Sequence, residues 1–325
     1  MDARPVLKGW AVTVSLAAAA LLLLGAAGVL HGVLATRLLR PPATLDRTVV
    51  LQGTASYTDT TALRTGDLQA LYRRQIPVTI NDQVRTVRSE GPVSVVQETW
   101  TVLGPDQKPV RASTHTFTLD RTTMLAAVVP PNPSAPVRQA LALGFPPNPQ
   151  PVDYPFWDVV TRTVAKAAYQ GTEVVSGRRA YRYLLRSGGP VTDPQVRTAL
   201  PGDLLVAPTS TTLADFWVDS LTSVVLRLHY RLAIQATQPG AEGTLPPVPV
   251  FSVDARLAPI AARVALAEAV GTQDEIFLVG TAAPVALLGL GALAAAATLA
   301  RLVRHLVRAT SRRDQAGVRL GPDVT

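Results

Sequence analysis

The sequence predicts a membrane-anchored, mainly β protein: one large extracytoplasmic β-rich domain of antiparallel meanders and hairpins between two transmembrane α-helices. Three features of the 325 residues predict it, namely an uncharged apolar run near each end, alternating strand-like segments between the runs, and an Arg-rich C-terminal end. Hydrophobic residues make up 47% of the chain and aromatic residues only 5%, so Ala, Leu and Val dominate. The absence of Cys excludes disulfides, zinc ribbons and thiol nucleophiles.

The two apolar runs are long enough to cross a bilayer as helices. Residues 9–36 carry no formal charge, and neither do residues 276–300. At about 1.5 Å per residue, both runs exceed a hydrocarbon layer of roughly 30 Å. A cleavable signal peptide is the alternative for the first run, because Val33-Leu34-Ala35 offers a small-residue cleavage site. Signal peptides have apolar cores of only about 7–15 residues, so we expect an uncleaved anchor.

The charges around the second run set the expected orientation. Glu268, Asp274 and Glu275 precede it and an Arg-rich tail follows it, which places the tail in the cytoplasm. Residues 1–8 and 301–325 are then cytoplasmic, and residues 37–275 form the extracytoplasmic domain of a two-pass plasma-membrane protein.

The net charge of +8 is concentrated at the membrane ends rather than in the main domain. A nucleic-acid partner is therefore not expected, and the expected partner is the lipid bilayer. A helix continuing past Ala300 would carry basic residues at the headgroup level, where each contributes about 1 kcal/mol of attraction to anionic lipid. The basic residues of this tail are Arg301, Arg304, Arg308, Arg312 and Arg313.

The central region reads as strands separated by turns. Runs rich in Val, Thr, Tyr, Phe and Trp alternate in polarity and are bounded by Gly, Asp, Asn or Pro. The candidate strands are Thr48 to Tyr57, Val93 to Val102, Arg111 to Leu119, Glu173 to Ser176 and Ala180 to Arg186. Short helices are expected at 137–143 and 258–270, the second ending at Gly271.

Two hairpins resemble each other closely enough to suggest an internal repeat. Phe117 to Thr123 and Phe216 to Thr222 each end a strand in Asp, followed three residues later by Thr. Asp120 and Asp219 are expected to accept hydrogen bonds from the backbone of their turns. Chance similarity is the alternative.

An aromatic cluster lies in the middle of the chain. Its most distinctive part is the run Tyr154, Pro155, Phe156, Trp157 and Asp158. Proline favours an extended Tyr154, and Asp158 is suited to cap a following turn. We expect the aromatic rings to form a core plug; an aromatic face that binds a ligand is the alternative.

Several short motifs along the chain carry a family resemblance. They are Gly53 to Tyr57, Phe145-Pro146, the run Tyr154 to Asp158, the hairpin containing Glu173 and Gly177, and the residues Tyr181 and Tyr183. With these motifs the whole chain resembles a bacterial envelope family, best populated in actinobacteria, that was catalogued as a domain of unknown function and is labelled the porin PorA family. The resemblance implies an envelope location and two-helix anchoring. One departure is Ser223, where the family usually has a turn Gly.

Catalytic and metal sites are not expected. The four His lie at 31, 115, 229 and 305, and none is paired at a spacing typical of metal ligands. There is no Gly-x-Ser-x-Gly elbow and no phosphate-binding Gly loop. We therefore expect no cofactor and no enzyme activity.

Three functions remain open at this stage. The leading expectation is an envelope protein whose extracytoplasmic β domain binds a ligand or partner, such as a lipid or another envelope component. The first alternative is a porin-like or channel-forming subunit. Transmembrane barrels use repeated segments of about ten residues without long apolar helices, so a pore is expected to need helix oligomers. The second alternative is a membrane sensor or scaffold. The oligomeric state is not predicted.

Overall fold

A computed structural model describes residues 4–31, 44–59, 62, 65–67, 69, 71–128, 138–195, 207–237 and 248–317. The chain divides into two compact units. One contains Met1–Leu39 together with Asp274–Thr325, and the other contains Arg40–Gln273. The first unit is helical, and the second holds the β-sheet.

The described part of the second unit contains twelve strands. They are β1 (Asp46–Thr58), β2 (Tyr72–Glu90), β3 (Val93–Leu103), β4 (Pro109–Asp120), β5 (Leu125–Val128), β6 (Arg138–Leu141), β7 (Tyr154–Asp158), β8 (Thr163–Val175), β9 (Arg178–Pro190), β10 (Ala207–Asp219), β11 (Val225–Thr237) and β12 (Val248–Leu257).

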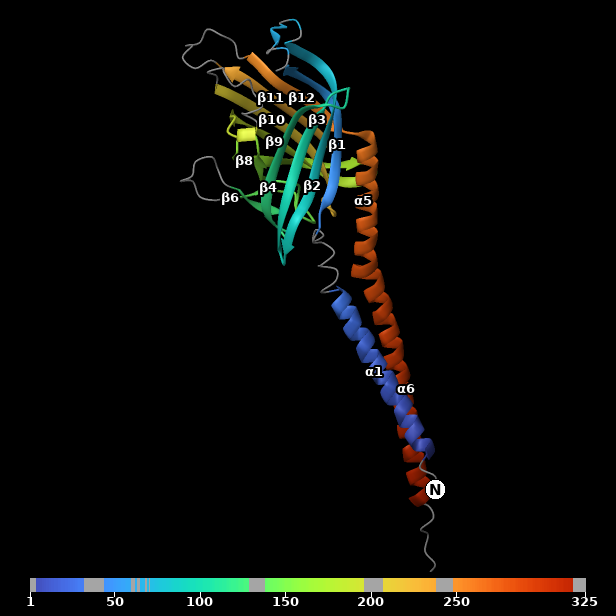
Figure 1. Cartoon of the computed structure of the whole chain (residues 1–325). Helices are drawn as coiled ribbons and strands as arrows, with labels where there is room; N and C mark the ends of the chain where they lie inside the picture. The colour runs from blue at the N-terminus through green and yellow to red at the C-terminus, as the bar shows by residue number, and fades with distance from the viewer. Residues whose placement is uncertain are drawn as a thin grey trace, which may run out of the picture. The chain divides into compact units, whose positions relative to one another are not determined.

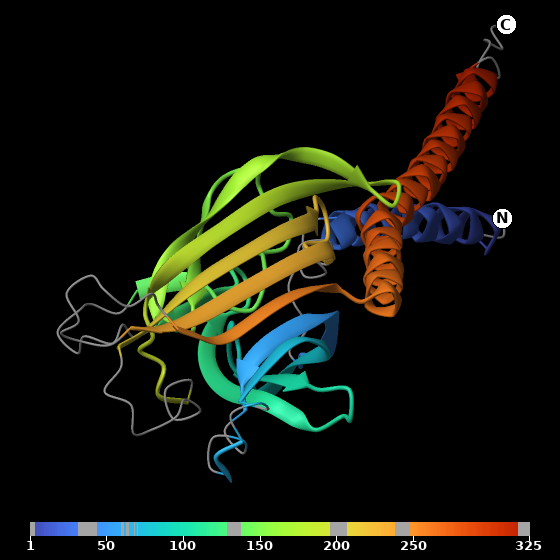
Figure 2. The same ribbon diagram turned by 90° about the horizontal axis from the view of Figure 1, so that it is seen from above.

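The strands form one closed barrel in chain order. Neighbours are antiparallel, except that β6 and β7 are parallel where Leu141 faces Phe156. β1 closes the barrel against β12, from Leu51 opposite Leu257 to Tyr57 opposite Phe251. Figure 1 shows β1 to β4 as adjacent strands, and Figure 2 shows β8 to β12 as one curved wall.

The closing seam requires a glycine at position 53. A Cβ atom there would collide with the carbonyl oxygen of Asp254 and the Cα of Ala255 on β12. No flexible side chain is involved, so the clash cannot be relieved without moving backbone. Gly53 therefore permits the close approach of β1 and β12.

Four helical segments complete the described chain: α1 (Arg4–Val29), α5 (Pro259–Phe277), the π-helix η2 (Leu278–Ala282) and α6 (Ala283–Gly317). In the helical unit, α1 and α6 lie side by side (Figure 1). A Cβ at Gly291 would lie 3.1 Å from side-chain carbons of Leu24, so a small residue keeps the helices close. The His31 Nδ1 also lies 2.8 Å from the carbonyl oxygen of Gly280.

The closed barrel corrects the expected fold class. The protein is not a β domain bracketed by two transmembrane helices, because the sheet closes on itself. Within the described residues, one helical run, Pro259–Arg308, is long and apolar enough to cross a membrane, whereas Val14–Val29 is a shorter apolar helix. Local strand patterns do not reveal that the first and last strands pair, and the end of the uncharged 9–36 run lies outside the described residues.

Four of the expected strands lie inside β1, β3, β4 and β9, and the fifth, Glu173 to Ser176, overlaps the end of β8, which stops at Val175 because Ser176 belongs to the turn. The two expected short helices need correction. The segment 138–141 is strand β6, because it pairs with β5 between Leu125 and Val128. The helix expected at 258–270 continues through Gly271, because this glycine does not have the positive φ of a helix-ending residue, and α5 extends to Phe277.

Candidate functional site

The barrel encloses a cavity of about 960 Å³. Along β3, β4 and β10 its lining residues alternate with residues that do not line it. On β10, Thr212, Ala214 and Phe216 line the cavity, whereas the alternating Leu213 and Asp215 do not. Side chains of a strand point alternately to the two faces of a sheet, so the cavity is the barrel interior.

The inner surface has two chemically different sides. The polar wall consists of every cavity-lining residue of β2, β3 and β4: Asp82, Glu98, Trp100, Arg111, Ser113 and His115. The apolar wall consists of Leu185 on β9, Ala214 and Phe216 on β10, and Leu228 and Leu232 on β11. Thr212 and Tyr230 interrupt the apolar wall.

Two acids of the polar wall form a pair. Asp82 and Glu98 share a side-chain hydrogen bond and feel the positive charge of Arg47. Burial raises the pKa of Asp82 to about 6, against the opposing effects of Arg47 and the hydrogen bond. Burial and the neighbouring Asp82 also raise the pKa of Glu98 well above its usual value. Close carboxyl groups of this kind retain a proton more readily than exposed ones.

His115 approaches a second buried acid. Its Nε2 lies 3.5 Å from Oδ2 of Asp193, whose side chain is only 5% exposed. Burial lowers the pKa of His115, Asp193 opposes this, and Arg162 adds to it. His115 is therefore mainly neutral at pH 7.

An aromatic contact joins the two sides of the cavity. The ring centroids of Trp100, on the polar wall, and Tyr230, on β11, are 6.2 Å apart in an edge-to-face arrangement. β3 and β11 are not neighbouring strands, so this contact narrows the interior. Ile260 and Val264 of α5 also line the cavity and remain 70% and 62% exposed.

The structure places the aromatic run of the sequence on β7, beside the cavity. Phe156, Trp157 and Asp158 are buried and line it. Asp158 accepts hydrogen bonds from the Val160 amide at 3.0 Å and the Thr161 hydroxyl at 3.0 Å. Asp158 thus caps the turn after β7, while the rings are both buried and next to the interior space.

Tyr154 and Tyr183 hold the neighbouring loop. The amide of Gln150 donates to the Tyr154 hydroxyl at 2.8 Å, and the Tyr183 hydroxyl donates to the Gln150 carbonyl at 2.6 Å. Tyr183 is fully buried and stacks on Phe145 with centroids 4.6 Å apart. Pro155, by contrast, is exposed, and Tyr181 packs edge-to-face on Tyr169.

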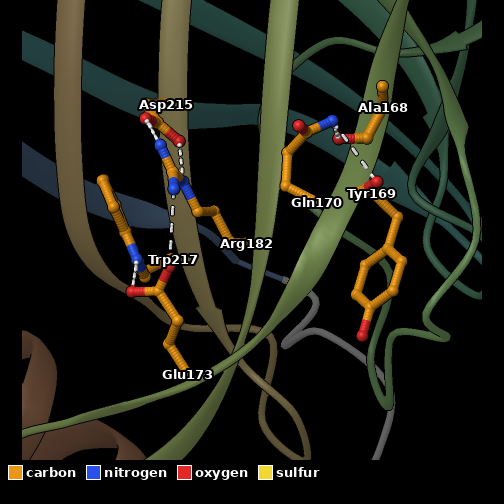
Figure 3. A network of polar contacts seen from close by, with 7 residues as sticks. All are labelled: Ala168, Tyr169, Gln170, Glu173, Arg182, Asp215 and Trp217. Atoms are coloured by element: carbon orange, nitrogen blue, oxygen red, sulfur yellow. Dashed lines mark hydrogen bonds and ion pairs between the residues drawn. The ribbon is translucent and has the colours of Figure 1, made fainter.

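Glu173 belongs to a polar network on the outer face of the barrel (Figure 3). It accepts a hydrogen bond from Trp217 Nε1 at 2.7 Å and lies 3.5 Å from the Arg182 guanidinium. Arg182 also donates twice to Asp215, at 2.9 and 2.6 Å. In the same figure, Gln170 Nε2 donates to the carbonyls of Ala168 and Tyr169. Glu173 therefore does not face the cavity.

The turns containing Asp120 and Asp219 share one construction. Asp120 Oδ1 accepts from the amides of Thr122 at 2.7 Å and Thr123 at 3.0 Å. Asp219 Oδ1 accepts from the amides of Leu221 at 3.1 Å and Thr222 at 2.8 Å. The next turn residues, Met124 and Ser223, have positive φ of 58° and 63°. Gly177 similarly has a positive φ of 80°, in the tight turn between β8 and β9.

The basic residues of the tail lie on α6. Arg301, Arg304 and Arg308 are exposed. Arg312 and Arg313 lie within the helix, but their side chains lie outside the described part.

No residue of the polar wall was predicted from the sequence as a site residue. The period of two along β4 is the signal that could have identified the wall. Arg111, Ser113 and His115 alternate in step with the buried Phe117 and Leu119 on the same strand. Because these three polar residues share a strand face with buried apolar residues, they predict a barrel interior that is partly polar. Among the described residues, no group of three His, Asp or Glu is arranged to hold a metal ion.

A closed barrel with a mixed polar and apolar interior defines a class of proteins that enclose or pass solutes. The family model described as Porin PorA matches residues 12–300. The chain therefore belongs to the porin PorA family. No curated protein matches it.

These findings overturn several expectations. The porin family and the closed barrel favour the porin-like alternative over an extracytoplasmic domain that binds a lipid or another envelope component. They point to an outer-membrane protein instead of a two-pass plasma-membrane protein. The two-helix anchoring implied by the resemblance is not confirmed.

Proposed function

We propose that this chain is a porin-like, channel-forming subunit in which the interior of the barrel selects the solute. The observation that carries the proposal is the cavity of about 960 Å³ inside a closed barrel, with most of its charged side chains on β1 to β4. Cavities of roughly 300–1,000 Å³ accommodate small organic molecules. No covalent step is needed for passage, so the proposal includes no enzyme activity.

The outer face of the barrel carries charged side chains, which favours contact with water or with another copy over contact with lipid. Lipid-facing barrels carry an apolar band roughly 25 Å tall. Here Arg182 and Asp215 form an ion pair on the outer face, and on the same face the imidazole of His229 lies 2.8 Å from the carboxylate of Asp254. Such a wall suits water or another polypeptide better than lipid tails. The membrane crossing is therefore assigned to the helical run Pro259–Arg308 or to contacts between copies.

Electrical recording in planar lipid bilayers tests the proposal directly. The purified full-length protein should give stepwise conductance. Glu98→Gln, inside the cavity, should change the ratio of cation to anion permeability, because it removes an interior acid. Gln97→Glu, which adds an acid at an exposed neighbouring position on β3, should not. Folded protein that leaves the bilayer silent would overturn the proposal.

A further inference from the structure

We propose that Arg111 forms an anion-binding position inside the barrel and that the preferred solute is an organic monocarboxylate with an aromatic or aliphatic body. The inference deepens the proposed function and rests on it for the role in transport. Four features of the cavity lead to it.

Arg111 is a buried cation that faces the cavity. On β4 it lies with Ser113 and His115 on the strand face that lines the cavity. Only 8% of the residue is exposed, and its Nη2 has no hydrogen-bond partner among the described residues. A buried guanidinium normally needs an anionic or hydrogen-bonding partner.

The direct contact of the Arg111 guanidinium is with an aromatic ring. The guanidinium carbon lies 4.8 Å from the centroid of the Phe251 ring. Among the described residues, no carboxylate forms an ion pair with Arg111. Burial lowers the pKa of Arg111, and the influence of Tyr230 and of Asp193 raises it. Since arginine stays protonated in proteins, its charge remains to be neutralised.

The interior acids are better provided with partners than Arg111. Asp82 and Glu98 share a hydrogen bond and the charge of Arg47. Asp158 accepts bonds from an amide and a hydroxyl of its own turn. Two atoms depart from this rule: Oδ1 of Asp82 and Oδ2 of Asp193 have no hydrogen-bond partner among the described residues, although the Asp193 oxygen lies 3.5 Å from Nε2 of His115. These atoms would favour a cationic solute, so the test must compare anionic and cationic probes.

The rest of the cavity requires an apolar body on the solute. Leu185, Phe216, Leu228 and Leu232 face the same space as Arg111. Burying an apolar group against such side chains is favourable. A carboxylate presents two oxygens to the planar guanidinium and can be bidentate. Together, the two walls match a compact body with a single carboxylate.

Three probes of nearly equal size test the charge preference: 1-naphthoate, neutral 1-naphthamide and cationic 1-naphthylmethylamine. Binding to the purified full-length protein in mild detergent is measured by calorimetry. We expect 1-naphthoate to bind about tenfold or more tighter than the amide, as for a charge-assisted hydrogen bond in a buried place. Equal binding of all three, or preference for the amine, would overturn the proposal without requiring any variant.

A matched pair of substitutions then locates the site. Arg111→Gln should abolish the preference of naphthoate over naphthamide. Arg231→Gln removes the same charge from an exposed position on β11 and should leave the preference intact. Arg111→Lys retains the charge and should preserve part of the preference for naphthoate. This variant serves as the test if Arg111→Gln fails to fold. A preference that survives Arg111→Gln would overturn the assignment.

The bilayer recordings separate this proposal from the proposed function. Conductance without a preference for naphthoate would refute the anion site and leave the porin-like function standing. A preference that depends on Arg111, in protein that never conducts, would refute the channel and leave the anion site standing.

Discussion

The polar and apolar walls of the barrel place their charges on opposite faces. On β9 and β10, the ion pair of Arg182 with Asp215 lies outside, and Leu185 and Phe216 line the interior. On β3 and β4 the arrangement is reversed. The hydroxyls of Thr99 and Thr114 meet at 3.4 Å on the face away from the cavity, while the acidic and basic side chains point inward. One half of the barrel thus has the ordinary pattern of a stable β-sheet, and the other half exposes charge to the cavity.

The difference between the two walls suggests that the apolar wall mainly determines stability and the polar wall mainly determines selectivity. Buried apolar area stabilises the fold, whereas interior charges cost free energy unless something pairs with them. We expect substitutions in the apolar wall to change unfolding more than conductance. Substitutions in the polar wall should change conductance more than unfolding.

The largest effect on stability is expected for Phe216→Ala. Phe216 packs against Phe145 and Phe156, with centroids 5.5 and 5.6 Å away. Loss of the ring should lower the free energy of unfolding by about 3 kcal/mol. The matched change Trp100→Ala, on the polar wall, should cost less than half of that and should raise conductance, since it removes the narrowing contact with Tyr230. Chemical denaturation and bilayer recording compare Phe216→Ala with Trp100→Ala. Equal losses of stability in both variants would contradict the proposed difference between the two walls.

The next effect concerns Asp82. Its raised pKa of about 6 means that the folded state holds a proton that the unfolded state has released, so stability is lost as the pH rises from about 4 to about 6. Asp82→Asn should therefore stabilise the protein by about 2–3 kcal/mol at pH 7, and the gain should vanish near pH 3. Asp254→Asn, on the outer face, should change stability by no more than about 1 kcal/mol. Destabilisation by Asp82→Asn at pH 7 would contradict the assignment.

The smallest effect is expected in the turns that end β4 and β10. Ser223 has a positive φ of 63°, which a residue with a Cβ adopts at a cost. Ser223→Gly should stabilise the turn of the apolar wall by about 1 kcal/mol. Met124 occupies the same place at the end of the polar wall but is buried, so Met124→Gly should destabilise. Thermal unfolding measures both, and a loss of stability in Ser223→Gly would argue against shared turn geometry.

The local parts of the fold could be predicted from the sequence. Alternation placed the strands now seen as β3 and β4 to within two residues at each end. Asp120 and Asp219 were correctly expected to bond the backbone of their turns, because such bonds involve only the next few residues.

The closure and the site could not be predicted in the same way. Closure depends on β1 meeting β12, a pairing between the two ends of the domain that no local pattern encodes. The polar wall depends on which face of each strand becomes interior. Glu98 and Arg111 look like ordinary surface charges until the burial of Val96, Val102 and Phe117 fixes that face. The central aromatic run, by contrast, can be recognised from the sequence alone, because its composition is unusual.

Thiol labelling during bilayer recording tests the central claim, that solutes pass through the barrel interior. The chain contains no Cys, so single-cysteine variants have no background. Ser113→Cys places a thiol in the cavity, and Thr116→Cys places one on the exposed face of the same strand. A negatively charged methanethiosulfonate should reduce the current of Ser113→Cys and leave that of Thr116→Cys unchanged. A current unaffected by complete labelling of Ser113→Cys would contradict passage through the barrel.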